Sequence, residues 1–227
     1  EAITDKTKVV MPVHWGGASP DMNSIKRICD DKKIYIVEDA CMGIGAKVQG
    51  LNPGTIGQIN AYSMHPLKSL NVMGDGGMVV TNDKSLYDWT KKYRNHGMVD
   101  RDHIEFWGVN MRLQPLQAIV ASHGLDRLEK TISRRNKNAK ILDHGLKKLK
   151  GFVELPERPS DNKETFALYM ALFQKRDELM KHLISNDIEV KIHYPLPLHK
   201  QKAAKQNCIF NDIDLKNVEY QASKLLT

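Results

Sequence analysis

Residues 63–68 read Ser-Met-His-Pro-Leu-Lys, and they stand at the end of an apolar run that predicts a buried strand. An earlier apolar run ends in a similar way at Glu38-Asp39-Ala40. Ligands of parallel α/β sheets bind at the carboxyl ends of the strands. We therefore expect Asp39, Ser63 and Lys68 to lie at one edge of a sheet.

These three residues suit an aldehyde cofactor that carries a phosphate. Lysine side chains form Schiff bases, and desolvation readily makes the free amine available for attack. A carboxylate at a strand end can hold the pyridine nitrogen of pyridoxal phosphate (PLP) protonated, which strengthens its electron sink. Taken singly, Asp39 is a common turn residue and Lys68 a common surface lysine. Their joint placement with Ser63 predicts a PLP site.

The composition indicates a globular chain with an apolar core. Of the 227 residues 41% are hydrophobic, yet no apolar run approaches the roughly 18 residues of a membrane span. The first residues lack the profile of a signal peptide. Cys29, Cys41 and Cys208 are widely spaced and form no Cys-x-x-Cys, so we expect neither a disulfide framework nor a metal site. These features favour a cytoplasmic location.

The net charge of +7 admits nucleic acid as a partner, but the arrangement of the charges argues against it. The densest basic group lies between Arg134 and Lys150, where leucine and isoleucine recur among the charges. That pattern is typical of the solvated face of an amphipathic helix. We expect neither nucleic acid nor a membrane as a partner, whereas a positive field would attract small molecules that carry phosphate.

The first half of the chain alternates strand and helix patterns. Strands are predicted over residues 8–14, 33–38, 61–64 and 78–81. Near-continuous apolar strands that alternate with helices predict an α/β fold with a mostly parallel sheet flanked by helices.

Two helices are predicted next to these strands, one between the first two and one after the last. Ser19 is expected to cap a helix over residues 20–32, and Asn82 or Asp83 to cap a second helix that runs to about His96. The inward residues of the first helix are expected to be Met22, Ile25 and Ile28.

The second half has a different character. Residues 114–150 are predicted to form two helices that meet near 131–134. A strand over 164–173, a helix over 175–186 and a strand over 188–193 are expected to follow.

This change of pattern predicts two domains. We expect part of a large cofactor-binding domain over residues 1–133 and part of a smaller α+β domain over residues 134–227.

Several short motifs of this sequence occur in one order. They are Thr7-Lys8-Val9-Val10-Met11-Pro12-Val13-His14, Glu38-Asp39-Ala40, residues 63–68, Gly74-Asp75-Gly76-Gly77-Met78-Val79, Arg94-Asn95-His96-Gly97, Gly108-Val109-Asn110-Met111-Arg112 and His193-Tyr194-Pro195. Together they resemble the DegT/StrS family of PLP-dependent sugar aminotransferases of fold type I, over essentially the whole chain. The resemblance implies amino transfer from an amino acid such as glutamate onto a keto-sugar. That sugar would be nucleotide-linked and used for a surface polysaccharide or lipopolysaccharide.

The resemblance also implies roles for particular residues. Lys68 would form the Schiff base with PLP and move the proton during transamination, Asp39 would pair with the pyridine nitrogen, and Ser63 would bind the phosphate. Asn110 would reach the phosphate from the neighbouring subunit, because the active sites of the family lie at the interface of a homodimer. The residues expected near the substrate are His65, Arg112, His193 and Tyr194.

Three departures from the family pattern qualify these expectations. Met42 takes the cofactor-binding position where the family usually has a polar residue, often glutamine, near the ring hydroxyl. Asp75 replaces a glutamate. The N-terminal stretch of the family, which supplies part of the phosphate cup and a stacking aromatic residue, has no counterpart here. We therefore expect an internal fragment of such an enzyme that holds PLP weakly by itself.

Two alternatives stay open. Some relatives replace the lysine with histidine and dehydrate the sugar, so a PLP-dependent sugar dehydratase is one alternative, although Lys68 argues against it. The other is a non-catalytic fragment or paralogue with a binding or regulatory role, which Met42 and the truncated ends favour.

Overall fold

The computed structural model describes residues 2–207 and 215–227, so Cys208 lies outside the described residues. The chain divides into two compact units. The first comprises Glu1–Lys137 with Pro159–Ala167, and the second comprises Asn138–Arg158 with Leu168–Thr227. The division expected from the sequence assigned everything after residue 133 to the second domain, whereas here the segment 159–167 returns to the first unit.

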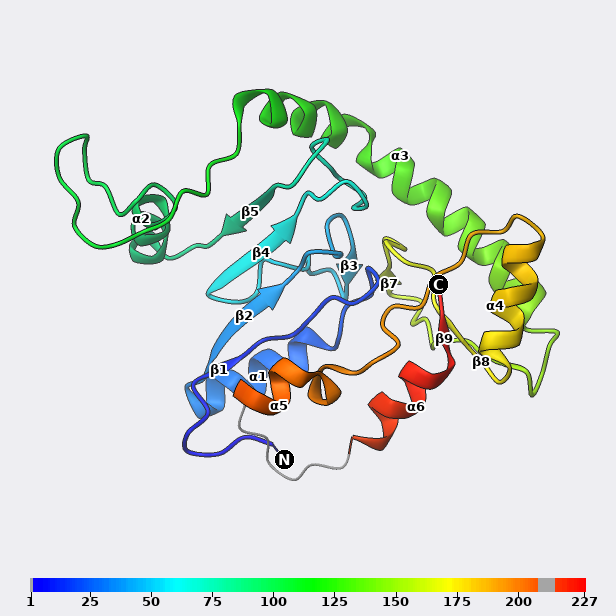
Figure 1. Cartoon of the computed structure of the whole chain (residues 1–227). Helices are drawn as coiled ribbons and strands as arrows, with labels where there is room; N and C mark the ends of the chain where they lie inside the picture. The colour runs from blue at the N-terminus through cyan, green and yellow to red at the C-terminus, as the bar shows by residue number, and fades with distance from the viewer. Residues whose placement is uncertain (1, 208–214) are drawn as a thin grey trace. The chain divides into compact units, whose positions relative to one another are not determined.

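The first unit is built on a four-stranded sheet, and Figure 1 shows its strands side by side. The strand order is β1 (Val9–Val10), β2 (Tyr35–Asp39), β4 (Ile59–Ser63) and β5 (Gly77–Val80). β1 pairs with β2 and β2 with β4 in parallel, while β4 and β5 are antiparallel. The sheet is therefore mixed, because no crossover helix lies between β4 and β5 to return the chain for a parallel pairing.

Helix α1 (Met22–Lys32) connects the first two strands. It is capped by Asp21, whose carboxylate accepts from the Ser24 N–H at 3.1 Å, and not by Ser19 as expected. A carboxylate directly before the first helical turn satisfies an N–H group that would otherwise have no partner. Ser19 instead forms a hydrogen bond with His14 at 2.8 Å.

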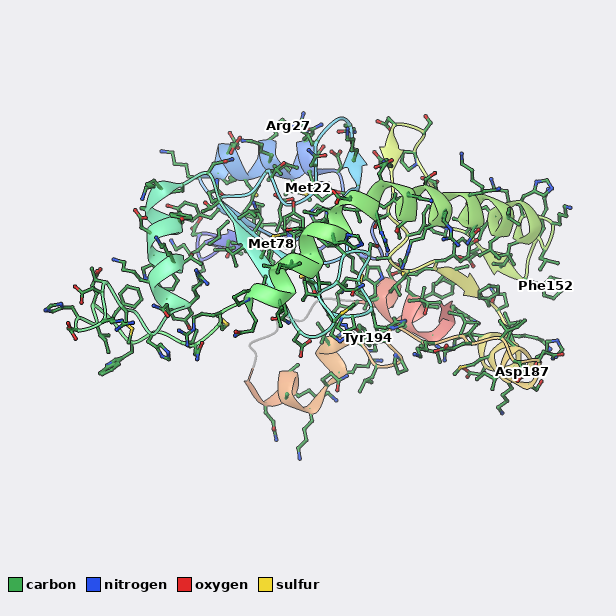
Figure 2. All side chains as sticks on the ribbon, turned by 90° about the horizontal axis from the view of Figure 1, so that it is seen from above. Met22, Arg27, Met78, Phe152, Asp187 and Tyr194 are labelled. Atoms are coloured by element: carbon green, nitrogen blue, oxygen red, sulfur yellow. The ribbon has the colours of Figure 1, made fainter. Side chains whose placement is uncertain are left out.

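One face of α1 packs against the sheet. Met22 and Cys29 are each 1% exposed and form a core with Ile36 of β2. Figure 2 shows Met22 on the side of α1 toward the sheet and Arg27 on the opposite side. Ile28 is 47% exposed, so its predicted inward position was wrong. The helical period explains this, because residue 28 lies about 100° around the axis from residue 29.

Helix α2 (Lys84–Tyr93) begins as the sequence predicted, with the Asp83 carboxylate accepting from two N–H groups of the first turn. It ends three residues before His96, and the Gly97 N–H donates to the Lys92 carbonyl at 2.9 Å. Gly97 has φ +73°, and a Cβ on it would meet the Phe106 carbonyl oxygen at 1.6 Å. Only glycine therefore allows this close approach of two backbone segments.

Helix α3 (Pro115–Leu146) is one continuous helix of 32 residues rather than two. The expected break at 131–134 contains neither proline nor glycine, so nothing interrupts the backbone hydrogen bonds there. Ile132 in this stretch is completely buried.

The predicted strand over 164–173 was also wrong, because only Ala171–Phe173 of this stretch form a strand. β7 (Asn162–Lys163) pairs with β3 (Lys47–Val48) in the first unit, and β8 (Ala171–Phe173) belongs to the second. Phe166 between them has φ +47°, which a continuous strand does not permit.

The second unit contains an antiparallel sheet in the order β6 (Val153–Glu154), β8 and β9 (Leu225–Leu226). Its helices are α4 (Arg176–Ser185), the 3₁₀ helix η1 (Leu198–Lys200), α5 (Lys202–Asn207) and α6 (Lys216–Lys224). The helix expected over 175–186 is confirmed as α4. Residues 188–193 form no strand, and Lys191 only exchanges a pair of backbone hydrogen bonds with Thr227.

Across residues 2–207 and 215–227, no helix combines the length and the apolar character needed to cross a bilayer.

Candidate active site

Asp39 and Ser63 lie on one face of the first sheet and at the same end of neighbouring strands. Asp39 is in register with Ala61 of β4, and Ser63 follows two residues later. Side chains alternate between the two faces of a strand, so the side chains of Asp39 and Ser63 project from the same face. Tyr35 of β2 shares this face and is 63% exposed. At the other end of the strands, Asp39 and Ser63 are both partly exposed.

Lys68 lies in the turn that follows β4. Its backbone N–H donates to the His65 carbonyl at 2.8 Å, and its side chain is half-buried. Its Nζ atom forms no hydrogen bond and no ion pair with any residue in the described ranges. A half-buried amine without a partner is available to react with an aldehyde.

The Cys41 thiol lies among these three residues. Burial, together with the hydrogen bond and the negative charge of Asp39, raises the pKa of Cys41 to about 11. The positive charge of Lys68 and a hydrogen bond with the Ser63 backbone act in the opposite direction. The Cys41 N–H also donates to Asp39 Oδ1 at 3.1 Å, which orients the carboxylate. Asp39 and Ser63 thus share one end and one face of the sheet, and the charge of Lys68 acts on the Cys41 thiol beside Asp39.

A fully buried carboxylate, which the sequence patterns did not single out, lies on the opposite face of the sheet. Glu38 and His14 are both completely buried, and His14 Nε2 donates to Glu38 Oε2 at 2.9 Å. The Glu38 carboxylate also accepts from the N–H groups of Gly54, Ile56 and Gly57 at 2.6 to 2.7 Å. A charged residue inside an apolar strand was the signal for this cluster, but its partners come from distant segments.

The pKa of Glu38 reflects this environment. Burial alone would raise the pKa, but the hydrogen bonds from His14 and from the three backbone N–H groups outweigh it and lower the pKa below its usual value. The carboxylate is therefore ionised at neutral pH, and it can only accept hydrogen bonds.

Glu38 should make the stability of the first unit depend on pH. A carboxyl group with a lowered pKa in the folded chain stabilises the fold above its unfolded pKa of about 4.3, and this contribution is lost as the pH falls through the folded value. We expect Glu38→Gln to lower the free energy of unfolding at neutral pH and to weaken its decline below about pH 5. Denaturant unfolding at several pH values measures both effects. Asp30→Asn, at an exposed site of α1, is the control, and an unchanged pH profile in Glu38→Gln would contradict the expectation.

Met42 connects two loops of the first unit. Its sulfur accepts from the Gly16 N–H at 3.3 Å, and its carbonyl accepts from the Thr165 hydroxyl at 2.9 Å. The Thr165 N–H donates to the Gly17 carbonyl at 3.1 Å. Thr165 of the segment 159–167 therefore bonds both to the loop that contains Gly17 and to the loop that contains Met42. The expected contact of Met42 with a cofactor ring remains a prediction.

Asn110 and Arg112 form a separate exposed cluster. Arg112 Nε donates to Asn110 Oδ1 at 2.9 Å, and Arg112 Nη1 donates to Asn95 Oδ1 at 3.3 Å. His65 is exposed, and its Nε2 atom lies 4.0 Å from Asp75 Oδ1. None of these side chains bonds to Asp39 or Lys68 within the described residues.

His193 and Tyr194 belong to the second unit. The His193 ring forms a hydrogen bond with Thr227 Oγ1 at 2.7 Å and an edge contact with the Tyr194 ring, with centroids 5.5 Å apart. Burial and the charge of Lys191 lower the pKa of His193. Their expected place near the substrate remains a prediction.

The whole chain, residues 1–227, matches the model of the DegT/DnrJ/EryC1/StrS aminotransferase family. The chain belongs to this family. A relative, the dTDP-3-amino-3,4,6-trideoxy-alpha-D-glucose transaminase of Streptomyces venezuelae, is 35% identical over 203 residues, which are 89% of this chain and 53% of the relative.

Two solved structures have the same fold as this chain. The crystal structure of Streptomyces venezuelae DesV in complex with a ketimine intermediate superposes with a TM-score of 0.92 at 33% identity, covering 99% of this chain and 60% of DesV. NtdA from Bacillus subtilis, with bound cofactor PMP, has a TM-score of 0.87 at 28% identity, covering 99% of this chain and 52% of NtdA. The α/β fold class of the PLP fold type I aminotransferases, expected from the sequence, is confirmed.

The chain spans about half the length of the curated DegT/DnrJ/EryC1/StrS relatives that it matches.

The residues at the sheet edge fit the cofactor that this aminotransferase family implies. An unpartnered, half-buried amine at Lys68, an oriented carboxylate at Asp39 and a hydroxyl at Ser63 are the donor set that an aldehyde, a pyridine nitrogen and a phosphate require.

Proposed function

We propose that the protein is a PLP-dependent aminotransferase that acts on a nucleotide-linked keto-sugar in amino-sugar biosynthesis. An amino acid such as glutamate gives its amino group to the keto carbon of the sugar and leaves as the corresponding oxo acid. The observation that carries the proposal is the unpartnered amine of Lys68 in the turn that follows β4, in a chain of this family whose Asp39 ends the neighbouring strand β2. The reaction is proposed to take place in the cytoplasm.

In the proposed reaction, Lys68, Asp39 and Ser63 each have a different role. PLP, when bound, supplies the electron sink that stabilises negative charge on the carbon that loses its proton. Lys68 attaches the cofactor through its amine and, once displaced by the amino donor, carries the proton between carbon atoms. Asp39 keeps the pyridine nitrogen protonated, and the Ser63 hydroxyl donates to the phosphate.

Covalent trapping tests this assignment most directly. The complete protein is incubated with PLP, reduced with borohydride and digested, and the modified peptide is identified by mass spectrometry. We expect the cofactor mass on the peptide that contains Lys68. Cofactor mass on another lysine would refute the assignment. A visible absorption spectrum of PLP that does not change when the protein is added would favour a non-catalytic binding or regulatory role. Release of a dehydrated sugar without transfer of nitrogen would favour the sugar dehydratase.

The proposed active site is shared between the two subunits of a homodimer. Asn110 would reach the phosphate in the site of the partner, while Lys68 would act in its own subunit. Two observations support this: Asn110 is exposed, and it bonds to Arg112 rather than to the residues around Lys68.

Mixing inactive subunits tests the shared site. Lys68→Ala and Asn110→Ala each disable the site to which the residue contributes, so a mixed dimer contains one site with both native residues. After subunit exchange we expect about a quarter of the wild-type activity from an equal mixture, because half of the dimers are mixed and each has one intact site. Lys68→Ala mixed with itself is the control. Absence of recovery after exchange has been verified by mass spectrometry would contradict a shared site.

A further inference from the structure

Two consecutive residues of β2 point in opposite directions. Asp39 projects from the face that carries Ser63, and Glu38 projects into the buried layer on the other side. Any rotation of the strand that moves one carboxylate therefore moves the other. Glu38 and Asp39 are mechanically coupled by the geometry of the strand itself.

His14 contacts both of these residues. Its ring donates to the Glu38 carboxylate at 2.9 Å, and its backbone N–H donates to the Asp39 carbonyl at 3.0 Å. The other ring nitrogen, Nδ1, forms a hydrogen bond with the Ser19 hydroxyl at 2.8 Å. His14 thus connects the buried side of β2 with the backbone of the residue that faces the proposed cofactor.

The ionised carboxylate of Glu38 can accept every hydrogen bond that its buried surroundings offer. Its two oxygens receive one N–H from His14 and three from the loop of residues 54–57. An ionised carboxylate accepts all of these hydrogen bonds, whereas a glutamine of the same size would turn its own N–H₂ group toward at least one donor. These four hydrogen bonds hold the Glu38 side chain in one position next to Asp39, at the carboxyl end of β2.

We propose that Glu38 and His14 are positioning residues that set the direction of the Asp39 carboxylate toward the pyridine nitrogen of the cofactor. Neither residue touches the cofactor. The buried hydrogen bonds of Glu38 fix the rotation of β2 at its carboxyl end, and the backbone of His14 fixes the same end from the segment that follows β1. This inference rests on the proposed function, since it concerns the PLP site.

The test compares Glu38→Gln with Ile36→Val in the complete protein. Ile36 lies two residues earlier on the same buried face of β2, so its substitution loosens the same core without altering the carboxylate. The measurements are the dissociation constant for PLP, the pH at which the bound cofactor changes its absorption, and the melting temperature. We expect Glu38→Gln to weaken PLP binding about tenfold, which corresponds to about 1.4 kcal/mol. We also expect it to move the pH midpoint in the same direction as Asp39→Asn does.

A double variant separates positioning from general destabilisation. If Glu38 acts through Asp39, then adding Glu38→Gln to Asp39→Asn should move the midpoint no further. Shifts of the pH midpoint that add up in the double variant would overturn the inference. So would a Glu38→Gln variant with a lowered melting temperature but with the same PLP affinity and pH midpoint as Ile36→Val. If Glu38→Gln does not fold, Ser19→Ala, which removes the hydrogen bond partner of His14 Nδ1, takes its place with the same expected directions.

Hydrogen exchange without cofactor keeps the two proposals distinguishable. We expect faster exchange of the Asp39, Ala40 and Cys41 amides in Glu38→Gln than in Ile36→Val, because the end of β2 is then held less firmly. Failure of the wild-type protein to bind PLP would refute the proposed function and would leave this exchange result to decide the positioning role. Equal exchange in the two variants would refute the positioning role.

Discussion

Lys68→Ala is expected to abolish transamination by the complete protein. The same amine attaches the cofactor and moves the proton, so its removal eliminates two contributions at once. Proton transfer by a positioned group alone is worth about 10²- to 10⁴-fold, so we expect a loss larger than this. The assay is formation of the oxo acid from the amino donor in the presence of the keto-sugar.

Two other lysines provide controls for this substitution. Lys84 and Lys91 lie on α2, where Lys84 pairs with Asp88. Alanine at either position removes the same number of atoms and the same charge, and we expect activity close to wild type. Equal losses in Lys68→Ala and Lys91→Ala would show that Lys68 has no special role.

Asp39→Asn is expected to cause the second large loss. A neutral amide no longer holds the pyridine nitrogen protonated, so the electron sink is weakened while the strand keeps its backbone hydrogen bonds. We expect the rate to fall by several powers of ten, which corresponds to a barrier higher by about 4 kcal/mol or more. Single-turnover kinetics with the amino donor measure this step without the contribution of product release.

The fold of the Asp39→Asn variant needs its own measurement. The side-chain oxygen of the introduced amide can still accept from the Cys41 N–H, so the melting temperature should change little. Asp30→Asn, an exposed substitution on α1, serves as the control for the loss of a carboxylate. A rate for Asp39→Asn within about tenfold of wild type, a difference of about 1.4 kcal/mol, would mean that Asp39 has a structural role only.

The sequence predicted the elements whose signals are local. A cap at Asn82 or Asp83 was expected for α2, and Asp83 provides it; the position of α4 followed from helical periodicity, which acts within a few residues. The errors arose where a competing local choice existed. Ser19 and Asp21 are both good caps, and in the structure Asp21 caps α1 while the Ser19 hydroxyl bonds to His14.

Other elements could not be predicted because they depend on distant segments. The stretch 164–173 is apolar enough for one strand, but only Ala171–Phe173 pair, in the second unit, whereas Asn162–Lys163 just before the stretch pair with β3. The boundary near residue 134 reflected a change of composition, yet α3 continues through it because a helix has no reason to stop without a breaker.

The sequence by itself determined the chemistry available at the sheet edge: a carboxylate, a hydroxyl and a lysine at the ends of two apolar strands, in the order of a known family. The tertiary structure alone decided their environment. Parallel pairing of β2 and β4 places Asp39 and Ser63 on one face, and the fold leaves the amine of Lys68 without a partner among the described residues. It also places His14 and the loop 54–57 around Glu38. Hydrogen bonds between segments far apart in sequence depend on the folded path of the chain, and no periodicity or motif encodes that path.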